Sequence, residues 1–286
     1  MAKITPTTKK LLLGKEIAHL RERAGMSQAQ AAAIVEKSQS RMADLEAGQS
    51  SITPGDLILL LKGFGVADED HVQALLELRR NNHQRGRWNG VRAKYSEQFR
   101  TMVDLEENCD LIRTVESEVP PGLLQCESFV RALYSHGNFG DDLEEHVKAR
   151  LVRQEIFHKP DPPHVAFVIS ESSLRRQFGP PEVMREQINY MIKLSRLPNV
   201  RLQVLPFKTR VQSGWIGDRF VLLRIPSPGV AGPLEFAYTE NEAELRYLDD
   251  KKVVDKLDAV WARLTGVALG FEETRRFLRK VAGDYS

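Results

Sequence analysis

Three consecutive polar side chains near residue 40 have the chemistry needed to read nucleic-acid bases. Gln39, Ser40 and Arg41 follow one another directly. A glutamine amide can form two hydrogen bonds with adenine, an arginine guanidinium can form two with guanine, and a serine hydroxyl can bond to any base. Such side chains read duplex DNA when a helix carries them into the major groove, so the surrounding sequence must supply that helix.

Two serines mark the starts of the helices that would present these side chains. Ser27 and Ser38 are good N-caps, because a serine hydroxyl accepts a hydrogen bond from a free backbone N–H of the first turn. The helix after Ser38 ends at Gly48, since glycine tolerates the left-handed conformation that follows a helix. Gln28 begins the preceding helix and is placed to contact a phosphate. The alternative is that both serines are only caps and residues 39–44 only a solvated face.

The apolar pattern around this pair predicts five short helices in all. Leu13 and Ile17 share one face of the first helix, and Thr53 followed by Pro54 gives the fourth a cap and a proline at its first position. The fifth is predicted from residue 68 to about residue 80. The complete set of helices, caps and gaps favours DNA binding over the solvated-face alternative.

Charge divides the 286-residue chain unevenly. The formal net charge is +2, but residues 1–100 hold 16 Lys and Arg against 11 Asp and Glu, a net of +5, which leaves −3 for the rest. A basic N-terminal third indicates a nucleic-acid partner. Residues 81–94 contain no acid and two glycines, as a linker would. We therefore predict a helix-turn-helix domain at 1–80, a basic linker at 81–94 and a C-terminal domain at 95–286.

The C-terminal domain has the pattern of a mixed α/β fold. Short apolar or alternating runs predict strands, which are 165–169, 200–205, 220–225 and 234–239. Helices are predicted at 95–110, 127–135, 143–158, 181–197, 249–265 and 271–281. The predicted fold class is α+β, with an all-α five-helix helix-turn-helix domain followed by a mixed α/β domain.

The segment from Leu13 to Val66 resembles the XRE family, the phage-repressor or Cro-like class of helix-turn-helix regulators. The matching residues are Ser27-Gln28 at the second helix and Leu45-Glu46-x-Gly48 at the end of the third. The chain departs from that family at two positions, Glu36 and Asp44.

Glu36 stands in the turn where the family often has glycine. A left-handed conformation costs an L-residue about 1–2 kcal/mol, so we expect a turn of different construction. Asp44 stands where relatives often have Arg or Gln. Phosphate would repel this carboxylate, but cytosine N4 can donate to it, so Asp44 is kept as a candidate base contact.

Three segments of the remaining chain form a recognisable set, which is Val119-Pro120-Pro121-Gly122-Leu123-Leu124-Gln125, Arg150-Leu151-Val152-Arg153-Gln154 and Val200-Arg201-Leu202-Gln203-Val204-Leu205-Pro206. In this order they resemble an actinomycete group of XRE-type regulators, described as WhiJ-like or antitoxin-like, whose C-terminal domain has no known function. The resemblance implies a dimeric regulator of development or secondary metabolism. It also implies a small partner protein, often encoded nearby, and supplies no catalytic motif.

Catalytic and metal chemistry have weak support in the sequence. His158 and His164 flank a proline-rich loop, but no third ligand follows at helical spacing. The phosphate-binding and nucleophile motifs G-x-x-x-x-G-K-[ST], G-x-G-x-x-G and G-x-S-x-G are absent. We therefore expect no enzyme activity, no metal and no cofactor. An enzyme with an appended DNA-binding domain is the alternative.

The chain lacks an apolar run of the roughly 20 residues that span a bilayer, so we expect a cytoplasmic protein without a membrane partner. Cys109 and Cys126 are far apart in sequence, which fits free thiols in a reducing compartment better than a disulfide.

The sequence thus predicts a sequence-specific DNA-binding transcription regulator, expected to be a repressor. One helix reads only a few base pairs, so we expect a homodimer on a palindromic double-stranded operator. The C-terminal domain would mediate dimerisation and bind a small partner protein or ligand. The alternative is an antitoxin-like protein that acts mainly by sequestering that partner. The candidate DNA contacts are Ser27, Gln28, Ser38, Gln39, Ser40, Arg41 and Asp44.

Overall fold

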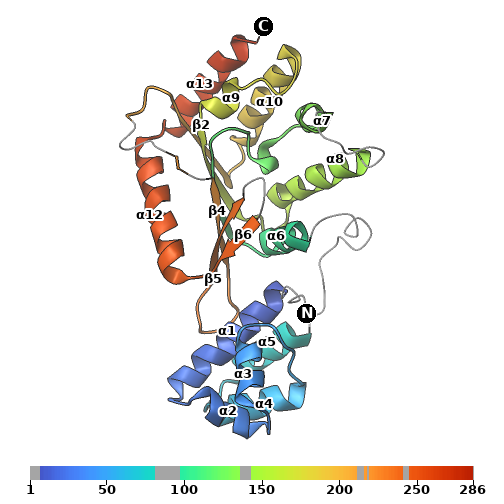
Figure 1. Ribbon diagram of the computed structural model, residues 1–286, viewed down its shortest axis with the longest axis vertical. Coiled ribbons are helices and arrows are strands. Elements are labelled where there is room, and N and C mark those ends of the chain that lie inside the picture. The colour runs from blue at the N-terminus through green and yellow to red at the C-terminus, as the bar shows by residue number, and fades with distance from the viewer. Residues whose placement is uncertain are drawn as a thin grey trace. The chain divides into compact units, whose positions relative to one another are not determined.

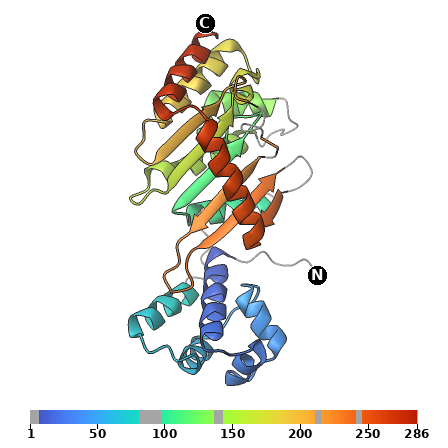
Figure 2. The same cartoon turned by 90° about the vertical axis from the view of Figure 1, so that its left-hand side faces the viewer.

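The computed structural model describes residues 7–80, 97–135, 143–210, 216–217, 219–240 and 245–285 (Figures 1 and 2). The chain divides into two compact units. The first unit consists of residues 1–108 together with 225–234, and the second of residues 109–224 and 235–286. The predicted linker, 81–94, lies outside the described residues.

The described part of the first unit contains the five helices predicted for the helix-turn-helix domain and the helix that was predicted at 95–110. They are α1 (Thr8–Arg23), α2 (Gln28–Ile34), α3 (Gln39–Glu46), α4 (Pro54–Gly63), α5 (Glu69–Arg80) and α6 (Glu97–Glu107). The caps act as predicted, because Ser27, Ser38 and Thr53 each accept a hydrogen bond from the backbone N–H three residues further on. The predicted all-α domain is confirmed.

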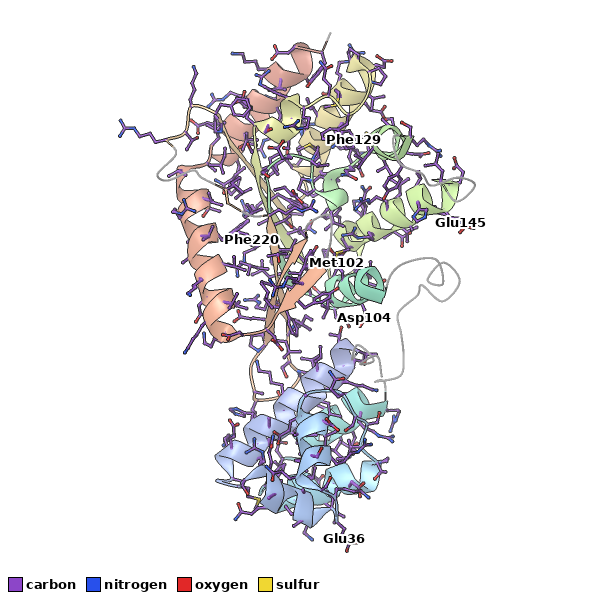
Figure 3. All side chains as sticks on the ribbon, viewed as in Figure 1. Glu36, Met102, Asp104, Phe129, Glu145 and Phe220 are labelled. Carbon is purple, nitrogen blue, oxygen red and sulfur yellow. The ribbon has the colours of Figure 1, made fainter. Side chains whose placement is uncertain are left out.

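Apolar side chains at helical spacing build the core of this unit. Ile17, Leu57 and Leu75 come from three different helices, and each has an exposed fraction of 0%. Thr8 ties α1 to α6, since its hydroxyl donates to Asp104 Oδ2 at 2.9 Å. Figure 3 labels Asp104 on α6.

Residues 225–234 belong to the first unit through the carboxylate of Glu16, which is fully buried on α1. It accepts hydrogen bonds from the Ser227 hydroxyl at 2.5 Å and from the backbone N–H groups of Val230 and Ala231 at 3.0 and 2.9 Å. A side chain at Gly229 would collide with this carboxylate, because its Cβ would lie 2.5 Å from Glu16 Oε1. His71 Nε2 lies 3.7 Å from Glu16 Oε2, so polar groups from α5 and from residues 227–231 together surround the buried carboxylate. The sequence did not predict this contact.

The second unit is built on a six-stranded mixed sheet in the order β3-β2-β1-β4-β5-β6. The strands are β1 (Leu111–Glu116), β2 (His164–Ser170), β3 (Val200–Leu205), β4 (Phe220–Ile225), β5 (Leu234–Glu240) and β6 (Leu245–Leu248). β1, β2 and β3 pair in parallel, and β1 pairs with β4 in antiparallel orientation, as do β5 and β6. The mixed α/β domain is confirmed, although β1 and β6 were not predicted.

Helices cover both faces of this sheet. They are α7 (Glu127–Ser135), α8 (Leu143–Val152), α9 (Ser172–Arg175), α10 (Pro181–Leu194), α12 (Lys251–Val267) and α13 (Phe271–Gly283), with the 3₁₀ turns η3 (Gly122–Leu124) and η5 (Arg153–His158). Val254 and Leu264 of α12 pack against Val115 and Leu222 of the sheet. A separate cluster joins Phe129 of α7 to Met184 of α10 and Cys126. Figure 3 labels Phe129 on α7 and Phe220 on β4.

The predicted helix 143–158 is wrong in its second half, because the chain leaves the α-helix after Val152 and continues as the 3₁₀ turn η5. The turn buries Arg153 and Gln154 at 8% and 9% exposure. Of the described helices, none has the length and apolar character needed to cross a membrane.

Candidate nucleic-acid interface

The first turn of α3 presents the three predicted base-reading side chains to solvent. Ser38 caps this turn, since its hydroxyl accepts from Arg41 N at 3.2 Å. Gln39, Ser40 and Arg41 are all exposed. The Arg41 guanidinium has one weak intramolecular contact, from Nη2 to Ser51 O at 3.5 Å. Most of its donors are therefore free for a nucleic acid.

Asp44 lies one turn further along α3, and its side chain is also exposed. Its backbone carbonyl accepts from Gln49 N at 2.8 Å and Ser50 N at 3.2 Å, which closes the end of the helix. These bonds leave the Asp44 carboxylate accessible. Its contact with cytosine stays a prediction.

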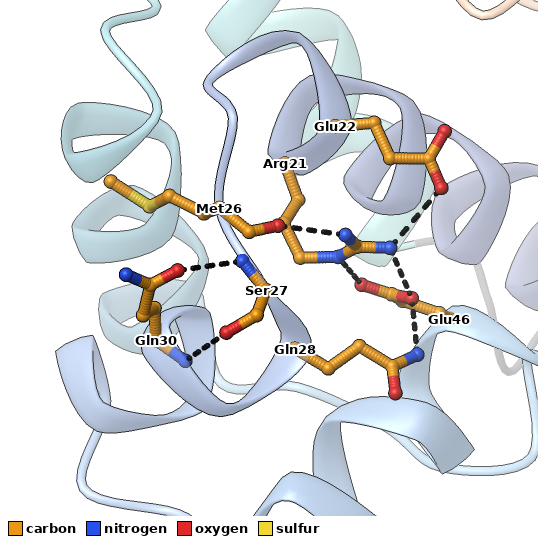
Figure 4. A network of polar contacts seen from close by, with 7 residues as sticks. All are labelled: Arg21, Glu22, Met26, Ser27, Gln28, Gln30 and Glu46. Carbon is orange, nitrogen blue, oxygen red and sulfur yellow. Dashed lines mark hydrogen bonds and ion pairs between the residues drawn. The ribbon is translucent and has the colours of Figure 1, made fainter.

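Ser27 and Gln30 form a complete capping box at the start of α2. Ser27 N donates to Gln30 Oε1 at 2.8 Å, and Gln30 N donates to the Ser27 hydroxyl at 3.2 Å. Figure 4 shows both bonds. The Ser27 hydroxyl keeps its own proton for a phosphate oxygen, while the Gln30 amide is already engaged.

The side-chain amide of Gln28 already forms one hydrogen bond within the protein. Its amide Nε2 donates to Glu46 Oε2 at 2.8 Å, which fixes the side chain between α2 and the last residue of α3 (Figure 4). An amide nitrogen carries two hydrogens, so one remains for a phosphate. Gln28 thus also orients the two helices, a role that the sequence did not suggest.

Arg21 is the centre of the polar network that holds α3 in place. The residue is 9% exposed, and its guanidinium donates to Glu46 from Nε at 2.5 Å and from Nη2 at 3.1 Å. Nη1 donates to the Met26 carbonyl at 2.9 Å, in the loop before α2 (Figure 4). The hydrogen bond to Glu46 raises the pKa of Arg21. Sequence reasoning named Glu46 only as a family cue and missed its partner.

Two glycines let α1 touch the backbone at the end of α3. A Cβ at Gly14 would lie 2.7 Å from the Leu45 carbonyl oxygen, which is too close for any side chain. Gly48 has φ +71°, and a Cβ there would lie 3.1 Å from Leu11 N. The position of α3 therefore depends on close packing between the backbone at its end and the backbone of α1. The sequence prediction used Gly48 as a helix stop and a family cue, and did not predict this contact with α1.

Glu36 contradicts the expectation of a differently constructed turn. It adopts the left-handed conformation itself, with φ +53°. Glu36 N donates to Ala33 O at 3.3 Å and Lys37 N to Ala32 O at 3.0 Å. This is the Schellman pairing that usually ends a helix on glycine. The Glu36 and Lys37 side chains are exposed, and Figure 3 labels Glu36 at the end of α2.

The histidines and cysteines that the sequence offers as reactive groups all belong to the second unit. Among the described residues, no three His, Cys, Asp or Glu side chains converge as metal ligands, and His158 and His164 are both exposed. Cys109 and Cys126 are buried free thiols, as the sequence predicted. Burial raises the pKa of the Cys126 thiol, which holds it in the unreactive protonated form.

Comparison with known proteins matches two family models along the chain. Residues 12–75 match the model of a helix-turn-helix domain, which lies within α1–α5. Residues 99–280, well over half of the chain, match the model of a domain of unknown function, DUF5753. No curated protein and no solved structure matches the chain. The capped helix pair and the matched ranges together show that the chain belongs to the DUF5753 family, with a DNA-binding helix-turn-helix domain ahead of the family domain.

Proposed function

We propose that the protein is a sequence-specific DNA-binding transcription regulator that inserts α3 into the major groove. The observation that carries this proposal is the exposed sequence Gln39, Ser40 and Arg41 on a capped first turn, with the rest of α3 locked to α1 by Arg21 and Glu46. A rigid helix with free polar side chains at its N-terminal end fits the docking geometry of a recognition helix.

The neighbouring side chains then take supporting roles. The free protons of Ser27 and Gln28 would bond to phosphates on either side of the groove. Lys37 is exposed in the turn directly before the Ser38 cap, so its ammonium group would neutralise one phosphate. Asp44 would accept from a cytosine amino group one turn further along α3.

We also propose an XRE-type repressor that acts as a homodimer on a palindromic operator. Two-fold symmetry would double a site that one helix reads over only a few base pairs. The resemblance to phage repressors supports the repressor role, and the resemblance to WhiJ-like regulators supports a small partner protein. In this proposal the DUF5753 domain mediates dimerisation and binds that partner or a ligand, without catalysis.

The direct test selects operators from a random duplex library with the full chain, then measures the affinity of Gln39→Ala and Arg41→Ala. Losing a bidentate base contact costs about 1–3 kcal/mol, so each variant should bind the operator about 5- to 150-fold more weakly. Binding to unrelated DNA should change little for Gln39→Ala. Arg23→Ala is the matched control, because Arg23 is an exposed arginine at the end of α1. Operator preference that survives both α3 substitutions would contradict the assignment of α3.

A further inference from the structure

The loop of residues 226–233 joins two strands of the mixed sheet, yet it belongs to the first unit. β4 ends at Ile225 and β5 begins at Leu234, so the loop continues directly into the sheet at both ends. Its residues also lie within the stretch that matches the DUF5753 family, although they form hydrogen bonds with α1. A displacement of β4 or β5 therefore reaches α1 through the chain itself.

Ser227 connects the loop to α1. Its hydroxyl donates to Glu16 Oε1 at 2.5 Å and accepts from Gly229 N at 3.2 Å, which folds the loop around the carboxylate. The N–H groups of Val230 and Ala231 complete the set of loop donors. Hydrogen bonds to an ionised group are about twice as strong as those between neutral groups, so these three bonds hold the loop on α1.

Lys15 extends the contact to the end of the loop. Its ammonium group donates to the carbonyl oxygens of Gly232 and Pro233, the last two residues before β5. Two consecutive residues of α1 thus bind the loop, one through its donors and the other through its acceptors. Bonds of both kinds give the loop a defined docked position.

α1 also contacts the recognition helix next to this loop. Gly14 directly precedes Lys15 and Glu16, and a Cβ on Gly14 would lie 2.7 Å from the Leu45 carbonyl oxygen of α3. Residues two apart on a helix point to nearly opposite sides, so Gly14 and Glu16 hold α1 from two directions. The docked loop therefore supports α1 on the side away from its contact with α3.

The Glu16 carboxylate has a second polar neighbour, which gives the loop an alternative state. His71 of α5 places Nε2 3.7 Å from Glu16 Oε2. Within the described part of the chain, this nitrogen is buried and has no hydrogen-bond partner. With a hydrogen on Nε2, His71 would donate to the carboxylate after a small shift. The carboxylate can thus bind the loop or, once the loop is released, move onto α5.

We propose that the 226–233 loop is a latch through which the DUF5753 domain regulates the DNA-binding helix α3. Docked on Glu16, the loop holds α1, and with it the end of α3, in the arrangement that binds DNA. Release of the loop leaves α1 and α3 less ordered, which lowers operator affinity. A ligand or partner that displaces β4 or β5 would shift the balance between the two states by its difference in affinity for them. The regulatory role rests on the proposed DNA-binding function, whereas the docking of the loop does not.

Hydrogen exchange of the full chain without DNA tests the latch, with Gly229→Ala as the main variant. The added Cβ would lie 2.5 Å from Glu16 Oε1, so either the loop lifts or the carboxylate leaves its donors. Loss of a hydrogen bond to a charged group should speed exchange of the Val230 and Ala231 amides about 10- to 150-fold. Amides of α3 should exchange about 5-fold faster or more. Unchanged exchange in either segment would overturn the latch.

Operator affinity measures the regulatory consequence. Gly229→Ala should bind the selected operator at least about 5-fold more weakly, although it alters no proposed DNA contact. Ser227→Ala removes one donor and adds no atom, so it should give the same changes at smaller size. Gly266→Ala in α12 is the matched control and should behave as the wild type, since its added Cβ would meet no neighbouring group of the described residues within 4 Å.

The two measurements separate the latch from the function it serves. Faster exchange with unchanged operator affinity would overturn the regulatory role. Failure to select any operator would overturn the proposed function together with its regulation, but not the docking of the loop, which exchange measures without DNA.

Val254→Ala tests whether the second unit acts through the loop. Val254 of α12 is buried in the cluster that contains Phe220 of β4 and Ala237 of β5. The cavity left by this substitution should loosen those strands, so the loop and α3 should both exchange faster. In a Gly229→Ala background the loop is already released, so exchange of α3 should not change further.

Val130→Ala is the matched control for this experiment. Val130 is buried on α7, which packs against α8 and α10, so its loss should leave the exchange of α3 unchanged. Equal effects of the two valine substitutions on α3 would contradict transmission through the loop.

Discussion

Glu36 has a conformation that glycine would adopt with less strain. A left-handed L-residue costs about 1–2 kcal/mol, and glycine is free of that cost but loses more chain entropy on folding. We expect Glu36→Gly to raise the free energy of unfolding of the first unit by up to about 1 kcal/mol, measured by urea denaturation. Glu36→Ala removes the same charge and keeps the strain, so it should not stabilise. Equal gains from both variants would assign the effect to charge.

Gly14, inside α1, gives the opposite expectation for an added side chain. Its absent side chain lets α1 contact the Leu45 carbonyl, which is backbone and cannot rotate away. We expect Gly14→Ala to destabilise the unit by about 1–3 kcal/mol and to lower operator affinity, because α3 must shift. Gly55→Ala is the control, since the nearest atom to its Cβ would be 4.0 Å away. That variant should be neutral or slightly stabilising. A neutral Gly14→Ala would show that α3 is not held by this contact.

The contribution of Cys126 to stability is expected to depend on pH. Its thiol pKa is raised mainly by burial, so the native state keeps the proton more firmly than the unfolded state. The resulting stability is present below the unfolded-state pKa and is lost as the pH rises through the folded-state value. Iodoacetamide should label native Cys126 slowly at pH 8, and labelling in urea should be fast. Fast native labelling would mean that the thiol is not shielded as the structure indicates.

At the scale of elements, α3 is held by the ion pair between Arg21 and Glu46. Breaking a buried pair by removing one partner costs about 3–5 kcal/mol, because the other charge stays buried and unpaired. We expect Arg21→Met and Glu46→Gln each to destabilise the unit strongly, and the double variant to lose less than the sum. Denaturation of the four proteins gives the coupling energy directly. Additive losses would show that the two charges do not depend on each other.

Elements with local signals were predictable, and elements fixed by distant partners were not. Ser27, Ser38 and Thr53 identified three helix starts, because a cap is a contact within four residues. β1 was missed because Arg113 and Thr114 interrupt its apolar run. Their places are set by the ion pair of Arg113 with Asp258 and by the strands on either side of β1.

In the candidate interface too, residues with a local signal were predictable and contacts between distant residues were not. Gln39 and Arg41 could be chosen from residue type and position after a cap. The sequence could not show that Gln28 bonds to Glu46 or that Arg21 completes the network, since these contacts cross 18 and 25 residues.

For the whole molecule, the proposed DNA complex should depend on salt in a way that separates phosphate from base contacts. We expect Lys37→Ala to weaken operator and unrelated DNA alike and to reduce the slope of log K against log salt by about 1. Gln39→Ala should leave that slope unchanged and weaken only the operator. Titrations at several salt concentrations test both. An unchanged slope in Lys37→Ala would remove Lys37 from the phosphate contacts.

Glu16 has a consequence for the order in which the protein becomes functional. Its hydroxyl donor, Ser227, lies 211 residues later in the chain. A ribosome adding about 5–20 residues per second would need about 10–40 s to make that stretch. During this interval the Glu16 carboxylate lacks the three donors that residues 227–231 supply. The DNA-binding unit, although encoded first, should therefore reach its full stability only after most of the chain has been translated.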